Sequence, residues 1–269
     1  MKKIMRICSA VIAAFVMAGC VSSTSGGSVG ADRSQLMLVS EETMEESARA
    51  SYAQVLAEAR TAGTLNKDPA VTARVQKIAK NLIAQVVAFR KDAASWNWQV
   101  NVISSSTVNA WCMPGGKIVV YTGIIDSLNL NDAQLAAVMG HEIAHALREH
   151  SREQASQDAL RSLGVAAVSE AAGLGDLGTG VLDLATQYTI TLPFSRSHET
   201  EADHIGTELM ARAGYDPNEA VNVWKKMSSL SGAQIPEILS THPSNSTRIA
   251  DLQEVVKTVY PLYEAASKK

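Results

Sequence analysis

The spacing of apolar residues changes along the chain, and each spacing predicts a different kind of element. Residues 41–62 and 69–89 carry helix-forming residues with apolar side chains three and four positions apart, which places those side chains on one helix face. In residues 96–102, tryptophan and valine alternate with polar residues, as expected for a half-buried strand. Residues 107–113 and 117–121 predict two further short strands.

The C-terminal half of the chain has an almost wholly helical pattern. Breaks interrupt it near residues 173–180, 214–217 and 242–243. Asp68 is a suitable N-cap for the second of the earlier helices. Together these elements predict an α+β fold, with a mostly helical body and a small β-sheet.

The N-terminus carries the pattern of an export signal. An apolar stretch over residues 7–17 follows several positive charges, and it is shorter than the ~20 residues that span a bilayer. Met-Ala-Gly-Cys at residues 17–20 resembles a bacterial lipobox, in which Cys20 would be acylated and become the first mature residue. Met17 stands where that pattern most often has leucine. The alternative is an ordinary cleaved signal with a chance cysteine.

These features divide the chain into three expected parts. Residues 1–19 form the signal peptide, residues 20–40 comprise the lipidated cysteine and a flexible tether rich in serine and glycine, and residues 41–269 form one folded domain. By resemblance, Val21 in place of aspartate favours the outer membrane over the inner one. The predicted location is therefore the bacterial periplasm, with a lipid anchor in the inner leaflet of the outer membrane.

Composition narrows the class of protein. The chain is 46% apolar and has a formal charge of −3, and removal of the three cations in residues 1–19 would make that −6. A mildly acidic surface argues against a nucleic-acid partner. Of the three cysteines, Cys8 would leave with the signal and Cys20 would carry lipid, so Cys112 remains alone and is expected to be buried.

The chemistry is carried by His-Glu-Ile-Ala-His at residues 141–145. The motif lies in a predicted helix that Asn131 and Gln134 can cap. His141 and His145 are four positions apart, so their rings can converge on one zinc ion at ~2.0–2.1 Å. Glu142 is ~100° further round the helix, where it can take a proton from a water molecule at the metal.

The third ligand must come from elsewhere in the chain. A metzincin would have Gly at position 148 and His at 151, but this chain has Arg148 and Ser151, which excludes that class. A later helix offers Glu199 and Asp203 on one face, so Glu199 can bind zinc while Asp203 accepts a hydrogen bond from a ligating histidine. Glu201 is the rival ligand, about 200° away from that face.

At this point the chain resembles a known family. HEIAH, then SHETEAD, then THP near the C-terminus, together with residues 109–123, are similar to the HtpX and CAAX-prenyl-protease family of zinc metallopeptidases. The likeness covers about residues 40–260 and is nearest to the family's periplasmic lipoprotein branch. It implies a gluzincin-type fold for residues 41–269, with the sheet beside the HExxH helix, one Zn²⁺ per chain and Glu199 as third ligand.

Other positions are weaker candidates. His242 could stabilise the transition state, or be a purely structural loop residue. By resemblance to some members of the family, it could instead cap the metal as an autoinhibitory fourth ligand. Arg248 matches an arginine of the family and could orient substrate, orient His242 or pair on the surface. By resemblance, the strand containing Asn109 and Ala110 could bind an extended substrate along its edge. The remaining histidines after the motif are expected to have no role in the site, and they are His150, His198 and His204.

The apolar, glycine-rich stretch at residues 163–192 could suggest a membrane hairpin. Charged residues interrupt it, and its longest uncharged run, residues 184–195, is shorter than the ~18 residues of a spanning helix. A helix on the core or a segment beside the active site is the preferred interpretation.

The sequence thus predicts a zinc-dependent endopeptidase that cleaves unfolded or misassembled cell-envelope proteins. Its partners would be those substrates and, through lipid on Cys20, a membrane, and its oligomeric state is left open. The alternative is a periplasmic chaperone or assembly factor for outer-membrane proteins with a gated or secondary protease site. A purely structural zinc site is disfavoured, because such sites usually close with a fourth protein ligand.

Overall fold

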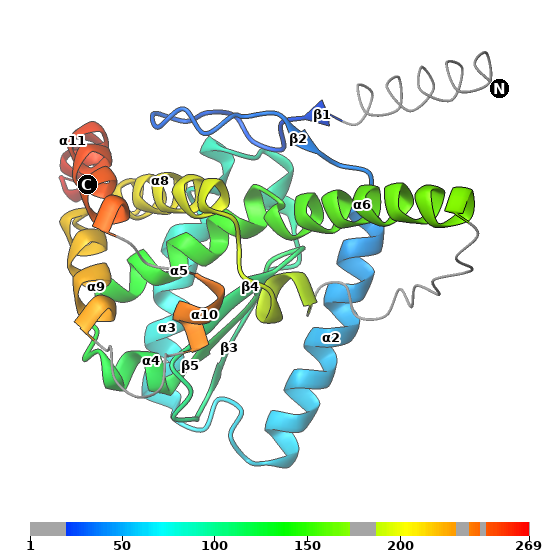
Figure 1. Ribbon diagram of the computed structural model, residues 1–269. Helices are drawn as coiled ribbons and strands as arrows, with labels where there is room; N and C mark the ends of the chain where they lie inside the picture. The colour runs from blue at the N-terminus through cyan, green and yellow to red at the C-terminus, as the bar shows by residue number, and fades with distance from the viewer. Residues whose placement is uncertain (1–19, 173–186, 230–236, 243–245, 269) are drawn as a thin grey trace.

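Figure 1 shows a computed structural model that describes residues 20–172, 187–229, 237–242 and 246–268. The expected signal peptide at residues 1–19 lies outside the described residues, as do the glycine-rich break at 173–186 and residues 243–245. The main elements of the body are α2 (Glu41–Thr61), α3 (Pro69–Ile83), β3 (Gln99–Ile103), β4 (Ala110–Met113), β5 (Lys117–Tyr121), α4 (Thr122–Ser127), α5 (Asp132–Leu147), α6 (His150–Ala172), the π-helical turn η3 (Gln187–Thr191), α8 (Arg196–Arg212), α9 (Asn218–Ser229), α10 (Glu237–Thr241) and α11 (Ser246–Ser267).

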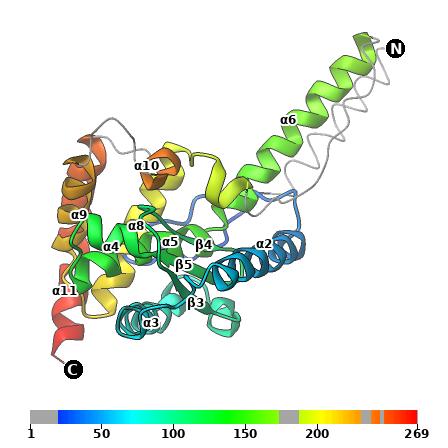
Figure 2. The ribbon, with the colours of Figure 1, turned by 90° about the horizontal axis from the view of Figure 1, so that it is seen from below.

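The three-stranded sheet has the order β3-β5-β4, with β3 parallel and β4 antiparallel to β5. Alternate residues of these short strands face two different cores. One face packs Ile118 and Val120 against α3 and α5, and the other packs Trp111 and Val119 against α2. The predicted α+β class, with a small sheet beside the helix of the HExxH motif, is confirmed (Figures 1 and 2).

Most predicted elements are present with shifted ends. The predicted cap Asp68 accepts hydrogen bonds from the first turn of α3, but that helix ends at Ile83 because the chain tightens into the 3₁₀ turn Val86–Ala88. The strand expected from residue 96 begins at Gln99. Cys112 is buried and free, as predicted.

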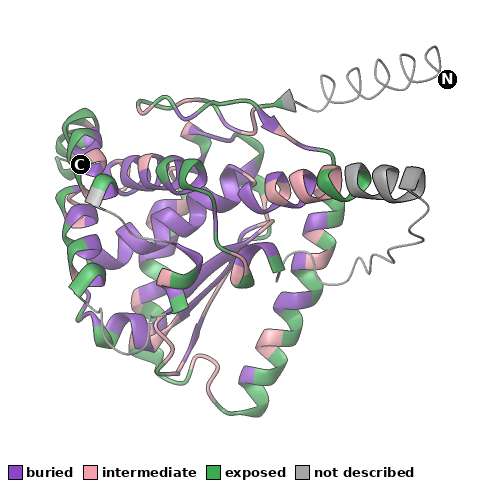
Figure 3. Ribbon diagram, viewed as in Figure 1, coloured by how far each residue is buried: buried purple, intermediate pink, exposed green. Residues whose placement is uncertain are grey.

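Helix α5 runs through the centre of the body and is buried along most of its length (Figure 3). Its capping box, formed by Asn131 and Gln134, is as predicted. It crosses α8 at two glycines, where a Cβ on Gly206 would lie 2.7 Å from the backbone nitrogen of His141. Only glycine permits the two backbones to approach this closely. The close crossing brings the first turns of α8 beside the HExxH motif.

The N-terminal segment, residues 21–36, differs from the flexible tether expected within residues 20–40. It is packed against the body, and β1 (Cys20–Val21) pairs with β2 (Gln35–Leu36). The backbone N–H of Ser25 donates to Phe89 O at 2.8 Å, and that of Ser28 donates to Glu208 Oε2 at 2.8 Å. The serine and glycine residues were interpreted as a flexible tether, but here the backbone of the segment is hydrogen-bonded to the body.

Helix α6 extends away from the rest of the body (Figure 2). Among the described residues, none of the helices combines the length and the apolarity that a membrane crossing requires.

Candidate metal centre and active site

The two histidines of the motif point from α5 toward one place. His141 Nε2 and His145 Nε2 are 3.1 Å apart. Glu199, in the first turn of α8, places Oε2 at 3.5 Å from His141 Nε2 and Oε1 at 3.4 Å from His145 Nε2. Ser195 caps α8 through the N–H of His198 and so fixes the start of the helix that carries this carboxylate.

His242 completes the cluster from the end of α10. Its Nδ1 lies 2.9 Å from Glu199 Oε1 and 3.3 Å from His141 Nε2. The ligand atoms of His141, His145, Glu199 and His242 lie within 4.8 Å of one another, and all four residues are buried. The structure therefore brings His242 close enough for either role that the sequence left open, a transition-state donor or a fourth metal ligand.

This donor set fits zinc. Imidazole nitrogens and a carboxylate oxygen are its usual ligands in proteins. His141 Nε2 and His145 Nε2 face each other directly beside a buried carboxylate. A cation between these two nitrogens can be bound by the lone pair of each. Without a cation, two neutral rings can share only one hydrogen between the two nitrogens. Burial raises the pKa of Glu199, but the surrounding histidines lower it by more, so the carboxylate is charged.

The catalytic candidate Glu142 lies beside the cluster. It is 3% exposed, and its Oε1 is 3.6 Å from His242 Nε2 without a hydrogen-bond partner in the described structure. Burial raises the pKa of Glu142, an effect opposed by His242 and His141. A buried carboxylate whose pKa is raised is suited to accept a proton and then return it.

Asp203 and Arg248 lie behind the ligands. Asp203 Oδ1 is 3.0 Å from His141 Nδ1, on the side of the ring opposite the metal position. Arg248 binds Glu199 Oε2 at 2.6 Å and both oxygens of Asp203 at 2.7 Å, and its guanidinium lies 3.7 Å from the centre of the Trp224 ring. Arg248 is 5% exposed, so it does not pair on the surface, and a role in orienting substrate stays a prediction.

The other two tentative substrate-binding residues have partners within the fold. The side chain of Asn109, which is 2% exposed, donates to Glu237 Oε1 at 3.0 Å and accepts from the N–H of Ala110 at 2.9 Å. The pair therefore links β4 to α10 and leaves the N–H of Ala110 already used. β4 is an outer strand of the sheet, and binding of an extended substrate along its edge stays a prediction.

An apolar pocket adjoins the catalytic candidates. It is bounded by His141 and Glu142 on one side and by Ala137, Val138, Val223, Trp224, Met227 and Ile238 elsewhere. Six of the eight residues that line it are apolar, so the two catalytic candidates border an apolar surface.

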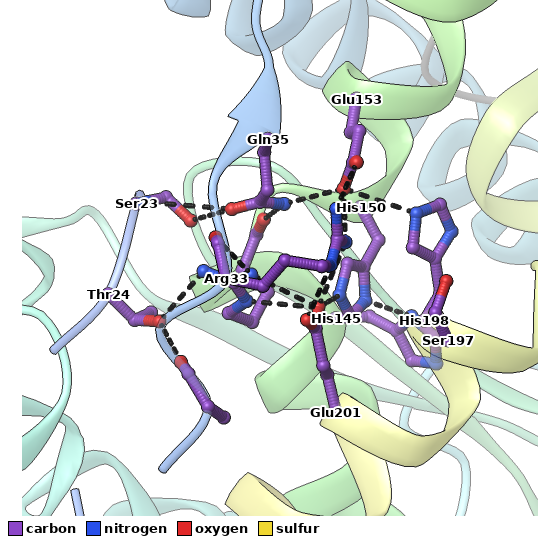
Figure 4. A network of polar contacts seen from close by, with 12 residues as sticks. Ser23, Thr24, Arg33, Gln35, His145, His150, Glu153, Ser197, His198 and Glu201 are labelled. Atoms are coloured by element: carbon purple, nitrogen blue, oxygen red, sulfur yellow. Dashed lines mark hydrogen bonds and ion pairs between the residues drawn. The ribbon is translucent and has the colours of Figure 1, made fainter. Parts of the chain in front are cut away.

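Two histidines that were expected to have no role are buried in the network drawn in Figure 4. His150 Nδ1 lies 2.9 Å from His145 Nδ1, and its Nε2 lies 2.9 Å from Glu201 Oε2. His198 stacks on the His150 ring at 4.4 Å between centroids and meets Glu153 at 3.2 Å. His150, for which no role was expected, is thus a buried neighbour of a predicted zinc ligand.

The reason lies in a break after α5. Glu149 has a φ of +52°, so α5 ends and His150 begins a new helix that turns back toward His145. Helical spacing could not reveal that return, since it assumes a continuous helix. His204 is partly exposed and pairs with Asp251 at 2.7 Å, as a surface group does.

Glu201, the rival ligand, is not in the metal cluster. Its carboxylate binds Arg148 at 3.1 Å and Arg33 at 2.8 Å, on the side of α8 away from Glu199. This separation is the one expected from two residues about 200° apart on a helix.

A helix-borne HExxH pair with a glutamate from a later helix defines a zinc metallopeptidase site of the gluzincin type. The sequence profile of Peptidase family M48 matches residues 69–256, and the chain belongs to that family.

Several curated proteins are similar to this chain. Mitochondrial metalloendopeptidase OMA1 of Schizosaccharomyces pombe is 38% identical over 186 residues, which are 68% of this chain and 52% of that protein. The Homo sapiens protein, Metalloendopeptidase OMA1, mitochondrial, is 30% identical over 246 residues, or 86% of this chain and 46% of the relative. Beta-barrel assembly-enhancing protease of Escherichia coli is 28% identical over 221 residues, 78% of this chain and 44% of that protein. The chain thus spans about half the length of these relatives.

Proposed function

We propose that this protein is a zinc-dependent endopeptidase that hydrolyses peptide bonds in unfolded or misassembled proteins of the cell envelope. The observation that carries the proposal is the position of Glu142 beside the His141, His145 and Glu199 cluster. Family membership and the similarity to metalloendopeptidases support it.

Zinc, when bound by this cluster, would polarise the peptide carbonyl and lower the pKa of water. Glu142 takes one proton from the attacking water while the water oxygen bonds to the carbonyl carbon. The same carboxyl group then gives that proton to the amide nitrogen as the carbon–nitrogen bond breaks. Asp203 fixes the ring of His141 through Nδ1, and Arg248 keeps the carboxylates of Glu199 and Asp203 in place.

The direct test is Glu142→Gln, compared with Glu254→Gln, which changes an exposed glutamate on α11. Glu142→Gln should retain its fold and one zinc per chain but hydrolyse casein about 10²–10⁴-fold more slowly, the usual contribution of a positioned acid–base group. Glu254→Gln should match the parent. Casein cleavage by Glu142→Gln at the parental rate would refute the mechanism.

An assembly or chaperone role is the second candidate, because one relative is named for enhancing β-barrel assembly. The two functions separate in a strain that lacks this protein. If hydrolysis is the function, Glu142→Gln will not restore envelope integrity. If it restores integrity fully, the assembly role is the main one.

We further propose that the mature protein starts at an acylated Cys20 and is held at the periplasmic face of the outer membrane. Support comes from the lipobox-like residues 17–20 and from Val21 after the cysteine. Radiolabelled palmitate should be incorporated into the parent but not into Cys20→Ala, and only the parent should sediment with outer membranes. Equal sedimentation of both proteins with outer membranes would contradict the proposed lipid anchor on Cys20.

A further inference from the structure

The N-terminal segment, residues 21–36, reaches a buried polar network that includes the candidate zinc ligand His145 (Figure 4). Arg33 from this segment binds Glu201 through Nε at 2.8 Å and Glu153 through Nη1 at 2.7 Å. Glu201 in turn meets His150, and His150 meets the ligand His145. A continuous chain of contacts therefore runs from the N-terminal segment to a metal ligand.

The direction of the hydrogen bonds in this chain follows from the role of His145. A metal ligand needs Nε2 of His145 without a hydrogen, so the hydrogen of the neutral ring is on Nδ1. That N–H donates to His150 Nδ1 at 2.9 Å, which must be the acceptor. His150 then carries its own hydrogen on Nε2 and donates to Glu201 Oε2 at 2.9 Å. Only one arrangement of hydrogens satisfies all three residues.

Two arginines hold the carboxylate of Glu201. This carboxylate is the end of the hydrogen-bonded chain His145–His150–Glu201, which is called the relay below. Arg148 Nη2 is 3.1 Å from Glu201 Oε2, and Arg33 Nη2 is 3.2 Å from the same oxygen. Arg148 is fully buried, and Glu201 is 9% exposed. With two guanidinium groups beside it, Glu201 is held as an acceptor in one orientation.

Arg148 depends on the N-terminal segment. Its Nη1 donates to the hydroxyl groups of Ser22 and Thr24 at 3.1 Å, and its Nη2 donates to the backbone oxygen of Arg33 at 3.0 Å. The side chain of Gln35 donates to the backbone oxygen of Arg148 at 2.6 Å. The segment therefore supplies acceptors without which a buried cation would be only partly satisfied.

We propose that His150 and Glu201 are positioning residues that fix the tautomer and orientation of His145, and that Arg33 of the N-terminal segment completes this support. The N-terminal segment is then a working part of the metal centre, so its loss or displacement weakens zinc binding. The inference rests on the proposed zinc peptidase function, but it concerns a different ligand from the one that Asp203 supports.

The first test replaces His150 in the full mature chain. His150→Phe keeps an aromatic ring but removes the acceptor, whereas the amide oxygen of His150→Asn can occupy the position of Nδ1 and accept from His145. Zinc affinity is measured by competition with a chelator, and ligand geometry by the visible absorption of the cobalt-substituted protein. His150→Phe should weaken zinc binding about 10–100-fold, which is the usual effect of losing the hydrogen-bond partner of a ligating histidine, and it should shift the cobalt spectrum. Asn should recover most of both.

The second test compares two arginine variants, because His150→Phe could fail to fold. Arg33 and Arg212 are 40% and 29% exposed, and each pairs with a glutamate on α8, Glu201 and Glu208. Glu208 also binds the N-terminal segment, through the N–H groups at residues 28 and 29, but none of its described contacts leads to a ligand histidine. Arg33→Gln should weaken zinc binding several-fold, whereas Arg212→Gln should leave it unchanged. Thermal unfolding of both metal-free variants measures any general loss of stability.

The outcomes separate the relay from the proposed function. If the parent binds zinc and cleaves casein while His150→Phe and Arg33→Gln both retain parental zinc affinity and cobalt spectra, the relay is wrong and the peptidase stands. If Arg33→Gln and Arg212→Gln lose affinity equally, the segment contributes only general stability and the relay is also wrong. If the parent binds no zinc, the proposed function itself fails.

Discussion

Asp203 lies beside His141, on the side of the ring that faces away from the metal position. Its Oδ1 is 3.0 Å from His141 Nδ1, while His141 Nε2 faces His145 Nε2 at 3.1 Å. Asp203→Asn keeps the shape of the side chain but has only one oxygen that can accept a hydrogen bond. His141 and Arg248 must share that oxygen, so one of these two donors faces the amide N–H groups. We expect zinc affinity, measured by chelator competition, to fall about 10–100-fold.

The matched control is Asp251→Asn. Asp251 also pairs with a histidine, His204, at 2.7 Å, but this pair is partly exposed and outside the metal cluster. It should change zinc affinity by less than about twofold. An equal loss in both variants would show that the effect of Asp203 is general and not exerted through His141.

The guanidinium group of Arg248 lies behind the metal cluster and carries a positive charge. It binds Glu199 and Asp203, which are 2% and 3% exposed. Arg248→Met leaves two buried carboxylates short of a partner, and removal of one member of a buried pair typically costs about 3–5 kcal/mol. Zinc partly replaces the lost charge at Glu199. We therefore expect the variant to lose more unfolding free energy when metal-free than when zinc-loaded.

Urea unfolding of both forms, with and without zinc, measures this difference. The control is Arg74→Met, which breaks the Arg74–Asp132 pair at 2.6 Å, where the aspartate is 58% exposed. Its effect should be small and independent of zinc, as for surface pairs. A loss at Arg248 that is the same in both forms would mean that the guanidinium and the metal do not share a carboxylate.

The parts of the site that lie within one helix could be predicted from the sequence. The four-residue spacing of His141 and His145 and that of Glu199 and Asp203 each define a face, and the structure brings these two faces together. The crossing itself depends on the close approach at Gly140 and Gly206, which no local pattern reports.

The parts that depend on a change of chain direction could not be predicted. His150 reaches His145 only because Glu149, two residues after the end of α5, has a positive φ. The N-terminal segment was interpreted from composition as a tether, but its polar groups pair with Arg148 and Glu208, which lie far along the chain. Residues that contribute single hydrogen bonds at long sequence separation leave no periodic signal.

The polar contacts of Glu153 with the N-terminal segment should also make the free energy of unfolding depend on pH. Burial alone would raise the pKa of Glu153, but hydrogen bonds from His198, Arg33 and Gln35 outweigh it, so the pKa lies below its usual value of about 4.3. A carboxyl whose pKa is lower in the folded protein stabilises the fold at pH values above its unfolded pKa. That contribution decreases as pH falls below the unfolded pKa and is fully lost below the folded pKa, because between the two the unfolded chain binds a proton that the folded protein does not.

Glu153→Gln removes this titration. We expect the parent to be more stable than Glu153→Gln at pH 7, and the gap in unfolding free energy to narrow below about pH 4.3. Urea unfolding at pH 7, 5, 4 and 3.5 in the presence of a chelator isolates the effect from zinc release. Glu254→Gln is the control, because Glu254 and its ion-pair partner Lys257 are both exposed side chains on α11. A gap that stays constant down to pH 3.5 would show that Glu153 titrates alike in the folded and unfolded protein, and that Arg33 is not held by a charged carboxylate.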